Sequence, residues 1–246
     1  MADTLLPGDF LLVNLAAYDL HTPTQIPVLG TPLKSITLFN ISVPEINDLV
    51  LFKFPDINVH TKPYNGESLI KRIIACSGDT LQIIQKHIYV NRKELILPPS
   101  SRRSFDNIKR KGREEKSIYF KGAGWNSDNY GPIVIPSKGD TIEISKDNLH
   151  IWQQLIVFEY KEKVVRVEGS VITISGKPAR NYIVQKNHYF VVGDNFNNST
   201  DSRYFGFIDE DMIIGRVMLI YWSMDEQNDS ENFFQKIRWD RIFDSF

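Results

Sequence analysis

A lysine lies among aliphatic side chains in the segment 68–75, which has the sequence SLIKRIIA. Alternation along a strand places Leu69, Lys71 and Ile73 on one face. If that face is buried, loss of hydration favours the neutral amine and lowers the lysine pKa below its usual value of about 10.4. Lys71 is therefore a candidate general base. The alternative is a solvent-facing lysine whose aliphatic stem covers apolar surface.

A second candidate is the polar loop 193–206, which has the sequence GDNFNNSTDSRYFG and follows the apolar run 189–192. Polar loops are usually turns, because Asn, Asp, Ser and Gly satisfy local backbone groups. This loop contains more donors and acceptors than a turn requires, and Asp201 and Arg203 can form an ion pair that makes it rigid. A rigid loop can present Ser199 as a fixed hydrogen-bond partner.

The residue types give no support for metal or cofactor chemistry. The five histidines lie at positions 21, 60, 87, 150 and 188, and no two have the spacing that directs both rings at one metal. The single cysteine, Cys76, excludes an internal disulfide framework and a multi-cysteine zinc or iron-sulfur site. Neither common type of glycine-rich phosphate-binding loop occurs. We therefore expect no metal and no cofactor.

The elements that must position these residues are predicted to be strands. Short segments rich in β-branched and aromatic residues alternate with Gly, Pro, Asn and Asp, which is typical of a mainly β protein. Strands are predicted at 10–14, 49–54, 69–75, 80–84, 87–91, 141–145, 164–168, 171–175, 188–192 and 213–222. One helix is predicted at 149–160, with Asp147 or Asn148 as its cap. Its apolar stripe comprises Leu149, Trp152, Ile156 and Tyr160.

Length and charge exclude several classes of protein. The chain has 246 residues, with 29 Lys and Arg against 30 Asp and Glu, and a formal net charge of -1. This balance provides no basic excess, so we expect no nucleic-acid binding. The longest apolar runs, 10–18 and 217–222, are shorter than the ~20 residues that a membrane-spanning helix needs. The first residues also lack the basic and apolar segments of a signal peptide.

The composition changes between about 97 and 121, where charged residues are crowded and aliphatic residues are scarce. Such a segment buries too little apolar surface to order itself, so a mobile surface loop is expected at 102–121. The change also marks the start of an inserted subdomain. We predict a discontinuous core domain formed by residues 1–96 and 186–246, with a non-catalytic subdomain at 97–185.

Several blocks of the sequence, taken in order, resemble one known family. The blocks are 1–9, 48–55, 71–74 with 77–80, 88–91, the loop 193–206 and 215–216, and the segments 124–132 and 138–141 resemble the inserted region of some Gram-negative members. Together they resemble the bacterial type I signal peptidases, membrane-anchored serine peptidases with a Ser/Lys dyad. The resemblance implies coiled antiparallel β-sheets of the signal peptidase type, with an inserted β-rich subdomain that carries one helix.

The resemblance also implies roles for individual residues. By matching positions, Lys71 is the general base, Ser199 orients its amine, and Asp201 with Arg203 forms a supporting pair behind the site. Shallow pockets accept small residues at the first and third positions before the cut. The residues at pocket-lining positions are Met1, Leu5, Leu11, Leu51, Leu69 and Ile70. The implied substrates are signal peptides of exported preproteins, cut after Ala-x-Ala-like sites.

In the family motif, the nucleophilic serine immediately precedes the methionine that aligns with Met1, and a second serine of the oxyanion hole lies two places further upstream. Neither serine is among the 246 residues, and the family's N-terminal membrane anchor is also absent from them. Thr4 does not substitute, because a displacement of several ångström removes the attack geometry. We therefore expect the 246 residues alone to fold without cleaving. The expected location is the periplasmic side of the inner membrane, against a lipid surface.

Two other functions compete with peptidase activity. A non-catalytic module that binds signal peptides or membrane partners fits the missing serine, whereas the retained Lys71 favours catalysis, because an unused buried lysine destabilises the fold. The self-cleaving repressor peptidases that also use Ser/Lys fit less well, since no DNA-binding segment or basic surface precedes the core. The sequence therefore predicts a signal peptidase, with the binding module as the alternative.

Overall fold

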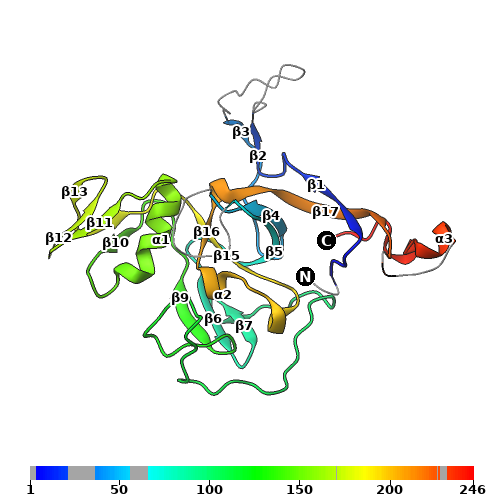
Figure 1. Cartoon of the computed structure of the whole chain (residues 1–246), viewed down its shortest axis with the longest axis horizontal. Helices are drawn as coiled ribbons and strands as arrows, with labels where there is room; N and C mark the ends of the chain where they lie inside the picture. Colours follow the sequence, from blue (N-terminus) through cyan, green and yellow to red (C-terminus); the bar gives the residue numbers. More distant parts are fainter. Residues whose placement is uncertain (1–3, 22–36, 56–65, 170, 226, 228–231) are drawn as a thin grey trace.

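The computed structural model describes residues 4–21, 37–55, 66–169, 171–225, 227 and 232–246. Within these ranges the chain forms five antiparallel sheets, three α-helices and three 3-10 helices. The largest sheet has six strands in the order β1-β17-β4-β5-β15-β16 and occupies the centre of the molecule (Figure 1). The predicted mainly β class is therefore confirmed.

The central sheet consists of β1 (Asp9–Asn14), β4 (Leu49–Lys53), β5 (Ser68–Ala75), β15 (His188–Val192), β16 (Ile208–Asp209) and β17 (Ile213–Ser223). The four-stranded sheet, in the order β8-β7-β6-β9, consists of β6 (Thr80–Ile84), β7 (His87–Val90), β8 (Lys93–Glu94) and β9 (Tyr130–Val134). The smaller sheets pair β2 (Asp19–His21) with β3 (Thr37–Asn40), β10 (Thr141–Glu143) with β14 (Asn181–Ile183), and β12 (Val171–Ile174) with β11 (Val165–Glu168) and β13 (Lys177–Pro178). The helices are α1 (Leu149–Tyr160), α2 (Ser202–Phe205), α3 (Phe233–Lys236) and the 3-10 helices η1 (Phe196–Asn198), η2 (Glu210–Met212) and η3 (Trp239–Arg241).

All the predicted strands are present, with boundaries within two residues of the prediction. Sequence analysis missed β9, because Pro132 lies at its centre and proline is excluded from central strands. β9 is an edge strand of its sheet, where proline is tolerated. No helix within the described ranges has the length and apolar composition that crossing a membrane requires.

The predicted helix is confirmed at its predicted bounds as α1. Asn148 precedes its first turn, and the Asn148 side chain accepts a hydrogen bond from the Ser145 N–H at 2.8 Å instead of capping the helix. The predicted apolar stripe is only partly correct, because Tyr160 is 42% exposed while the whole run 155–158 is buried. The helix buries two sides because it lies between two hydrophobic clusters.

The first cluster joins α1 to the four-stranded sheet and the small sheets. The second, called here the site-side cluster, lies around β4, β5, β15 and α2. It comprises Val50, Phe52, Phe54, Ile73, Val157, Phe158, Tyr189, Val191, Phe205, Ile208 and Met212. Each fully buried side chain of this size contributes about 1.5–3 kcal/mol of transfer free energy. The cluster therefore supplies a rigid, water-poor base for the strands that carry Lys71.

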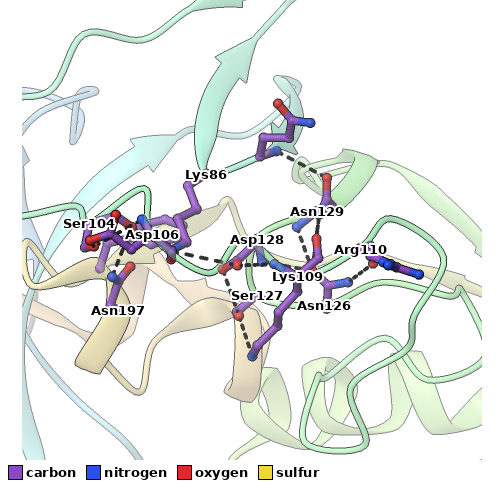
Figure 2. Close-up of polar contacts among 12 residues, drawn as sticks. Lys86, Ser104, Asp106, Lys109, Arg110, Asn126, Ser127, Asp128, Asn129 and Asn197 are labelled. Atoms are coloured by element: carbon purple, nitrogen blue, oxygen red, sulfur yellow. Dashed lines mark hydrogen bonds and ion pairs between the residues drawn. The ribbon is translucent and has the colours of Figure 1, made fainter.

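The charged segment 102–121, predicted as a mobile loop, is bound to the rest of the chain through its backbone. Asn126 is 0% exposed, and its amide nitrogen donates to the carbonyls of Arg110 at 3.0 Å and Arg113 at 2.9 Å. Figure 2 shows the side chains of Asn126 and Asn129 directed at this backbone. The prediction considered only the segment's own side chains, whereas buried asparagines elsewhere in the chain satisfy its peptide groups.

A buried lysine holds the start of the same segment. Lys86 donates from Nζ to the carbonyl of Asp106 at 3.1 Å and to the carbonyl of Ser104. Its Nζ also lies 4.0 Å from Asp128 Oδ2, which accepts a hydrogen bond from the Lys109 N–H at 2.9 Å. These contacts form the polar network of Figure 2, which fixes the segment against the hairpin of β6 and β7.

The predicted division into a core domain and an inserted subdomain at 97–185 stays a prediction, and several contacts cross it. β9 pairs with β6 of the flanking part. Arg102 forms a parallel bridge with Asn195, and its carbonyl accepts a hydrogen bond from the Phe196 N–H at 3.1 Å. The residues next to Arg102 therefore lie against the polar loop 193–206.

Replacement of Asn126 by alanine tests the network of Figure 2. The substitution removes the partners of four backbone groups in or beside the charged segment. We expect Asn126→Ala to lower the free energy of unfolding by about 2–4 kcal/mol, because each unsatisfied buried group costs about 1–3 kcal/mol. The exposed Asn181→Ala is the control and stays within about 0.5 kcal/mol of the parent in urea titrations. Equal stability of the two variants would show that the network does not hold the segment.

Candidate active site

Lys71 lies on β5, between β4 and β15 in the central sheet. Val50 is its cross-strand partner, and Leu69 and Ile73 share its face by strand alternation. Val50 and Ile73 are fully buried members of the site-side cluster, and Lys71 itself is half-buried. The face that Lys71 shares with Leu69 and Ile73 is therefore partly buried, and the lysine side chain extends from an apolar surface.

The Lys71 amine meets the polar loop at Ser199. Nζ donates a hydrogen bond to Ser199 Oγ at 3.1 Å. Ser199 follows η1 in an extended conformation, with φ -128° and ψ 130°. The short 3-10 turn ends there, and the extended residue directs its hydroxyl back toward β5. Sequence analysis predicted that this loop presents Ser199 to a partner, and the structure brings it to Lys71.

Gly193 allows this approach. Val192, the last residue of β15, pairs with Arg72, so Gly193 lies beside Lys71 in the register of the two strands. A Cβ atom at position 193 would lie 2.2 Å from Ser199 Oγ and 3.2 Å from Lys71 Nζ. The distance to the hydroxyl is far below van der Waals contact and the distance to the amine is shorter than most such contacts, so only glycine leaves room for the pair.

Burial lowers the pKa of Lys71 from its usual 10.5, because the charged amine loses hydration. The nearby carboxylates of Asp201 and Asp194 act in the opposite direction, and Arg203 reinforces the lowering. Desolvation is the largest of these effects, so the amine deprotonates more readily than that of an exposed lysine. A neutral amine 3.1 Å from a hydroxyl is suited to accept a proton.

The predicted pair of Asp201 and Arg203 is confirmed. Arg203 donates from Nε to Asp201 Oδ1 and from NH2 to Oδ2, both at 2.8 Å, and both side chains are almost fully buried. Asp201 Oδ2 also accepts the Gly193 N–H at 3.2 Å. The remaining guanidinium donors reach the carbonyls of Phe196 at 2.7 Å and Ser127 at 3.2 Å. The pair thus fixes the backbone under the amine, and one of its contacts is with Ser127, far from it in the sequence.

Sequence analysis missed a second buried pair. Arg72 donates from Nε to Asp194 Oδ1 at 2.9 Å and from NH2 to Oδ2 at 2.8 Å, and both side chains are nearly inaccessible. The signal was available, since the alternation that places Lys71 on one face places Arg72 between Ile70 and Ile74 on the other. A buried arginine between two isoleucines requires a carboxylate.

Three of the predicted pocket residues lie next to Lys71. Leu51 and Ile70 are cross-strand partners on β4 and β5, on the face opposite Lys71. Leu69 pairs with Phe52 and shares the face of Lys71. All three predicted residues are half-buried, so each presents apolar surface that further atoms can cover. The structure therefore brings these residues to both faces of the sheet at the lysine.

The other predicted pocket residues belong to the N-terminal part. Leu5 and Leu11 are half-buried, Leu5 in the turn before β1 and Leu11 on β1 itself, two strands away from β4. Met1 lies outside the described residues. Within the described ranges, no group of three His, Cys, Asp or Glu side chains is placed to hold a metal ion.

Comparison with known proteins gives a consistent family match. The family described as "Signal peptidase, peptidase S26" matches residues 1–122 and 117–222. Signal peptidase I of Buchnera aphidicola subsp. Baizongia pistaciae is 29% identical over 233 residues, covering 90% of this chain and 66% of the relative. Signal peptidase I of Helicobacter pylori strain J99 is 26% identical over 259 residues, covering 100% of this chain and 82% of the relative.

This chain spans about two thirds of the length of the Buchnera relatives that it matches. Among solved structures, a signal peptidase I of Enterococcus faecalis aligns with 72% of this chain and 98% of its own, at 19% identity and a TM-score of 0.33. This score is too low for a detailed comparison of the two folds.

Replacement of Lys71 by methionine tests whether its amine is desolvated. The folded state binds the Lys71 proton less tightly than the unfolded chain does, so the parent loses stability as pH falls below 10.5 toward the lowered pKa. We expect Lys71→Met to raise the free energy of unfolding at pH 7 by about 1.4 kcal/mol for each unit of lowering. The gain shrinks toward pH 10.5. The exposed Lys53→Met is the control and gives no such gain. Urea titrations from pH 6 to pH 10 measure both, and a destabilised Lys71→Met would contradict the assignment.

Proposed function

The chain belongs to the signal peptidase family, peptidase S26, and we propose that it is a serine endopeptidase that removes N-terminal signal peptides from exported preproteins. It cuts after Ala-x-Ala-like sites. The observation that carries the proposal is the 3.1 Å contact between Lys71 Nζ and Ser199 Oγ, at a half-buried position where the lysine pKa is lowered. A base that must be uncharged near neutral pH requires this kind of position.

The proposed nucleophile is a serine joined to the amino side of Met1. The neutral Lys71 amine takes the serine proton while the serine oxygen bonds to the scissile carbonyl carbon. The resulting ammonium gives the proton to the departing amine as the C–N bond breaks. Water then attacks the acyl-enzyme and loses a proton to Lys71, which returns it to the serine oxygen. One base thus serves both half-reactions.

Ser199 and the two arginine–aspartate pairs support this base. Ser199 fixes the direction of the Lys71 amine, so that a lone pair faces the nucleophile. The carboxylates of Asp201 and Asp194 would stabilise an ammonium if they were unpaired. Each is instead bound by two donors of an arginine, which offsets its charge at the amine.

The proposed specificity for small side chains depends on aliphatic walls. Leu69 is half-buried on the face of Lys71, and Leu51 and Ile70 are half-buried on the opposite face of the same strands. Leu5, Leu11 and Met1 belong to the N-terminal part of the chain. Aliphatic walls that leave room for little more than a methyl group discriminate against larger side chains by about 1–3 kcal/mol for each added methylene. This preference fits alanine at the first and third positions before the cut.

We further propose that the outer face of β1 and β17 contacts a lipid surface, on the periplasmic side of the inner membrane. Phe10 and Leu12 on β1 and Met218 and Tyr221 on β17 are exposed, and the rings of Phe10 and Tyr221 lie 6.1 Å apart. Neighbouring exposed apolar residues of this kind favour an interface with a membrane or a partner over a freely solvated face. We also propose that residues 1–96 and 186–246 form the core domain and that residues 97–185 form an inserted, non-catalytic subdomain.

A serine-extended chain tests the proposed reaction. This chain carries a Ser-x-Ser sequence directly before Met1, and its substrate is a peptide with an Ala-x-Ala site. We expect cleavage after the second alanine, and Lys71→Ala in the same chain lowers kcat by about 10³-fold or more, as removal of a catalytic base does. Mass spectrometry of the products locates the cut.

Two controls make the result interpretable. Replacing the serine before Met1 by alanine gives a chain of equal length that does not cleave, and the 246-residue chain alone does not cleave either. Unfolding curves establish that the Lys71→Ala chain remains folded. Cleavage that survives Lys71→Ala contradicts the proposed base, and binding of the peptide without any cleavage favours the non-catalytic binding module.

A further inference from the structure

The segment from Thr4 to β1 is held by side chains from distant parts of the molecule. Thr4 is only 3% exposed. Its hydroxyl donates to Asp194 Oδ2 at 2.6 Å and lies 3.2 Å from the carbonyl oxygen of Ser100. Threonine side chains are mostly exposed in folded proteins, so this burial indicates a specific attachment.

The attachment leads directly to the strand of Lys71. Asp194, which accepts the Thr4 hydroxyl, is bound at both oxygens by Arg72. Arg72 is the residue after Lys71 on β5. A continuous chain of buried hydrogen bonds therefore connects the segment leading to Met1 with the strand that carries the proposed base.

The C-terminal part of the chain also binds the segment between Thr4 and β1. Arg241, in η3, donates from NH2 to Asp9 Oδ2 at 2.6 Å and from Nε to Asp9 Oδ1 at 3.2 Å. The same NH2 group donates to the carbonyl of Thr4 at 2.9 Å. Asp9 also accepts the Leu6 N–H at 2.7 Å and the Ser223 hydroxyl at 2.6 Å. Arg241 thus locks a turn between Thr4 and Asp9.

We propose that Thr4 and Arg241 are positioning residues of the active site, which together fix the backbone leading to Met1 relative to Lys71. The inference rests on the proposed function, in which the nucleophile is joined to Met1. Arg241 lies beyond the residues that match the family, which end at 222. Only the structure connects it to the site.

Thr4 acts through its hydroxyl and Arg241 through its guanidinium, and close replacements can remove or keep each group. Valine has the shape of threonine without the hydroxyl, whereas serine keeps the hydroxyl. Lysine keeps the charge of Arg241 but has no planar fork that binds both Asp9 oxygens and the Thr4 carbonyl together. A displacement of about 1 Å at the nucleophile lowers the rate by about 10²-fold. Loss of either contact therefore affects the rate more than it affects substrate binding.

Kinetics of the serine-extended chain test the proposal. We expect Thr4→Val to lower kcat by about 10²-fold and Arg241→Lys by about 10-fold, with smaller changes in KM. Thr4→Ser keeps kcat within about 3-fold of the parent, because the hydroxyl remains. The double variant loses about as much as Thr4→Val alone, since both residues hold one segment. The exposed Thr141→Val and Arg180→Lys are matched controls with unchanged kcat.

The pH dependence of kcat shows whether a variant has lost positioning of the nucleophile or has altered the base, Lys71. The apparent pKa of kcat is the same in Thr4→Val and the parent, because Lys71 keeps its surroundings. An unchanged kcat in Thr4→Val, or a loss that Thr4→Ser does not rescue, overturns the proposal. A rise in KM that accounts for the whole loss of kcat/KM, with kcat unchanged, also overturns it.

Hydrogen exchange in the 246-residue chain keeps this test independent of the proposed reaction. The Leu6 and Asp9 amides are bonded within the turn, to Asp9 Oδ2 and the Leu6 carbonyl. We expect their exchange to be about 10-fold faster in Arg241→Lys, with no change at the amides of β5. If the extended parent chain does not cleave but the exchange in Arg241→Lys is faster as expected, the proposed function is wrong and the attachment of the Thr4–Asp9 turn by Arg241 is supported. Unchanged exchange contradicts that attachment.

Discussion

The structure depends on keeping one lysine amine poorly hydrated among charged groups. Lys71 projects from the face of β5 that packs on the site-side cluster, and burial lowers its pKa. Two carboxylates nearby favour the ammonium, and each is bound at both oxygens by a buried arginine. Arg203 acts against the effect of the carboxylates on the Lys71 pKa, and desolvation is the largest effect on the amine.

Each of these pairs is completed by a part of the chain far from it in sequence. Arg203 donates a hydrogen bond to the carbonyl of Ser127, a residue of the polar network of Figure 2. Asp194 receives the Thr4 hydroxyl, and Thr4 is held in turn by Arg241. The central sheet supplies the lysine, but the geometry around it is set where the segments that contain Thr4, Ser127 and Arg241 meet that sheet.

Local patterns in the sequence predicted the strands, α1, the buried face of Lys71 and the pair of Asp201 and Arg203. These features depend on alternation, capping residues and side chains two positions apart. The pair of Arg72 and Asp194 and the contacts of the charged segment join residues that no local pattern relates. The segment 102–121 was misjudged for this reason, since the buried asparagines that satisfy its backbone lie outside it. The roles of the pocket residues stay predictions.

The most direct test of the central claim is a site-specific titration of Lys71 in the folded 246-residue chain, by NMR of isotopically labelled lysine. The Lys71 resonance is assigned by its loss in Lys71→Met. The account predicts that Lys71 titrates clearly below 10.5. A Lys71 amine that titrates at or above 10.5 would contradict the claim that this site holds a neutral base.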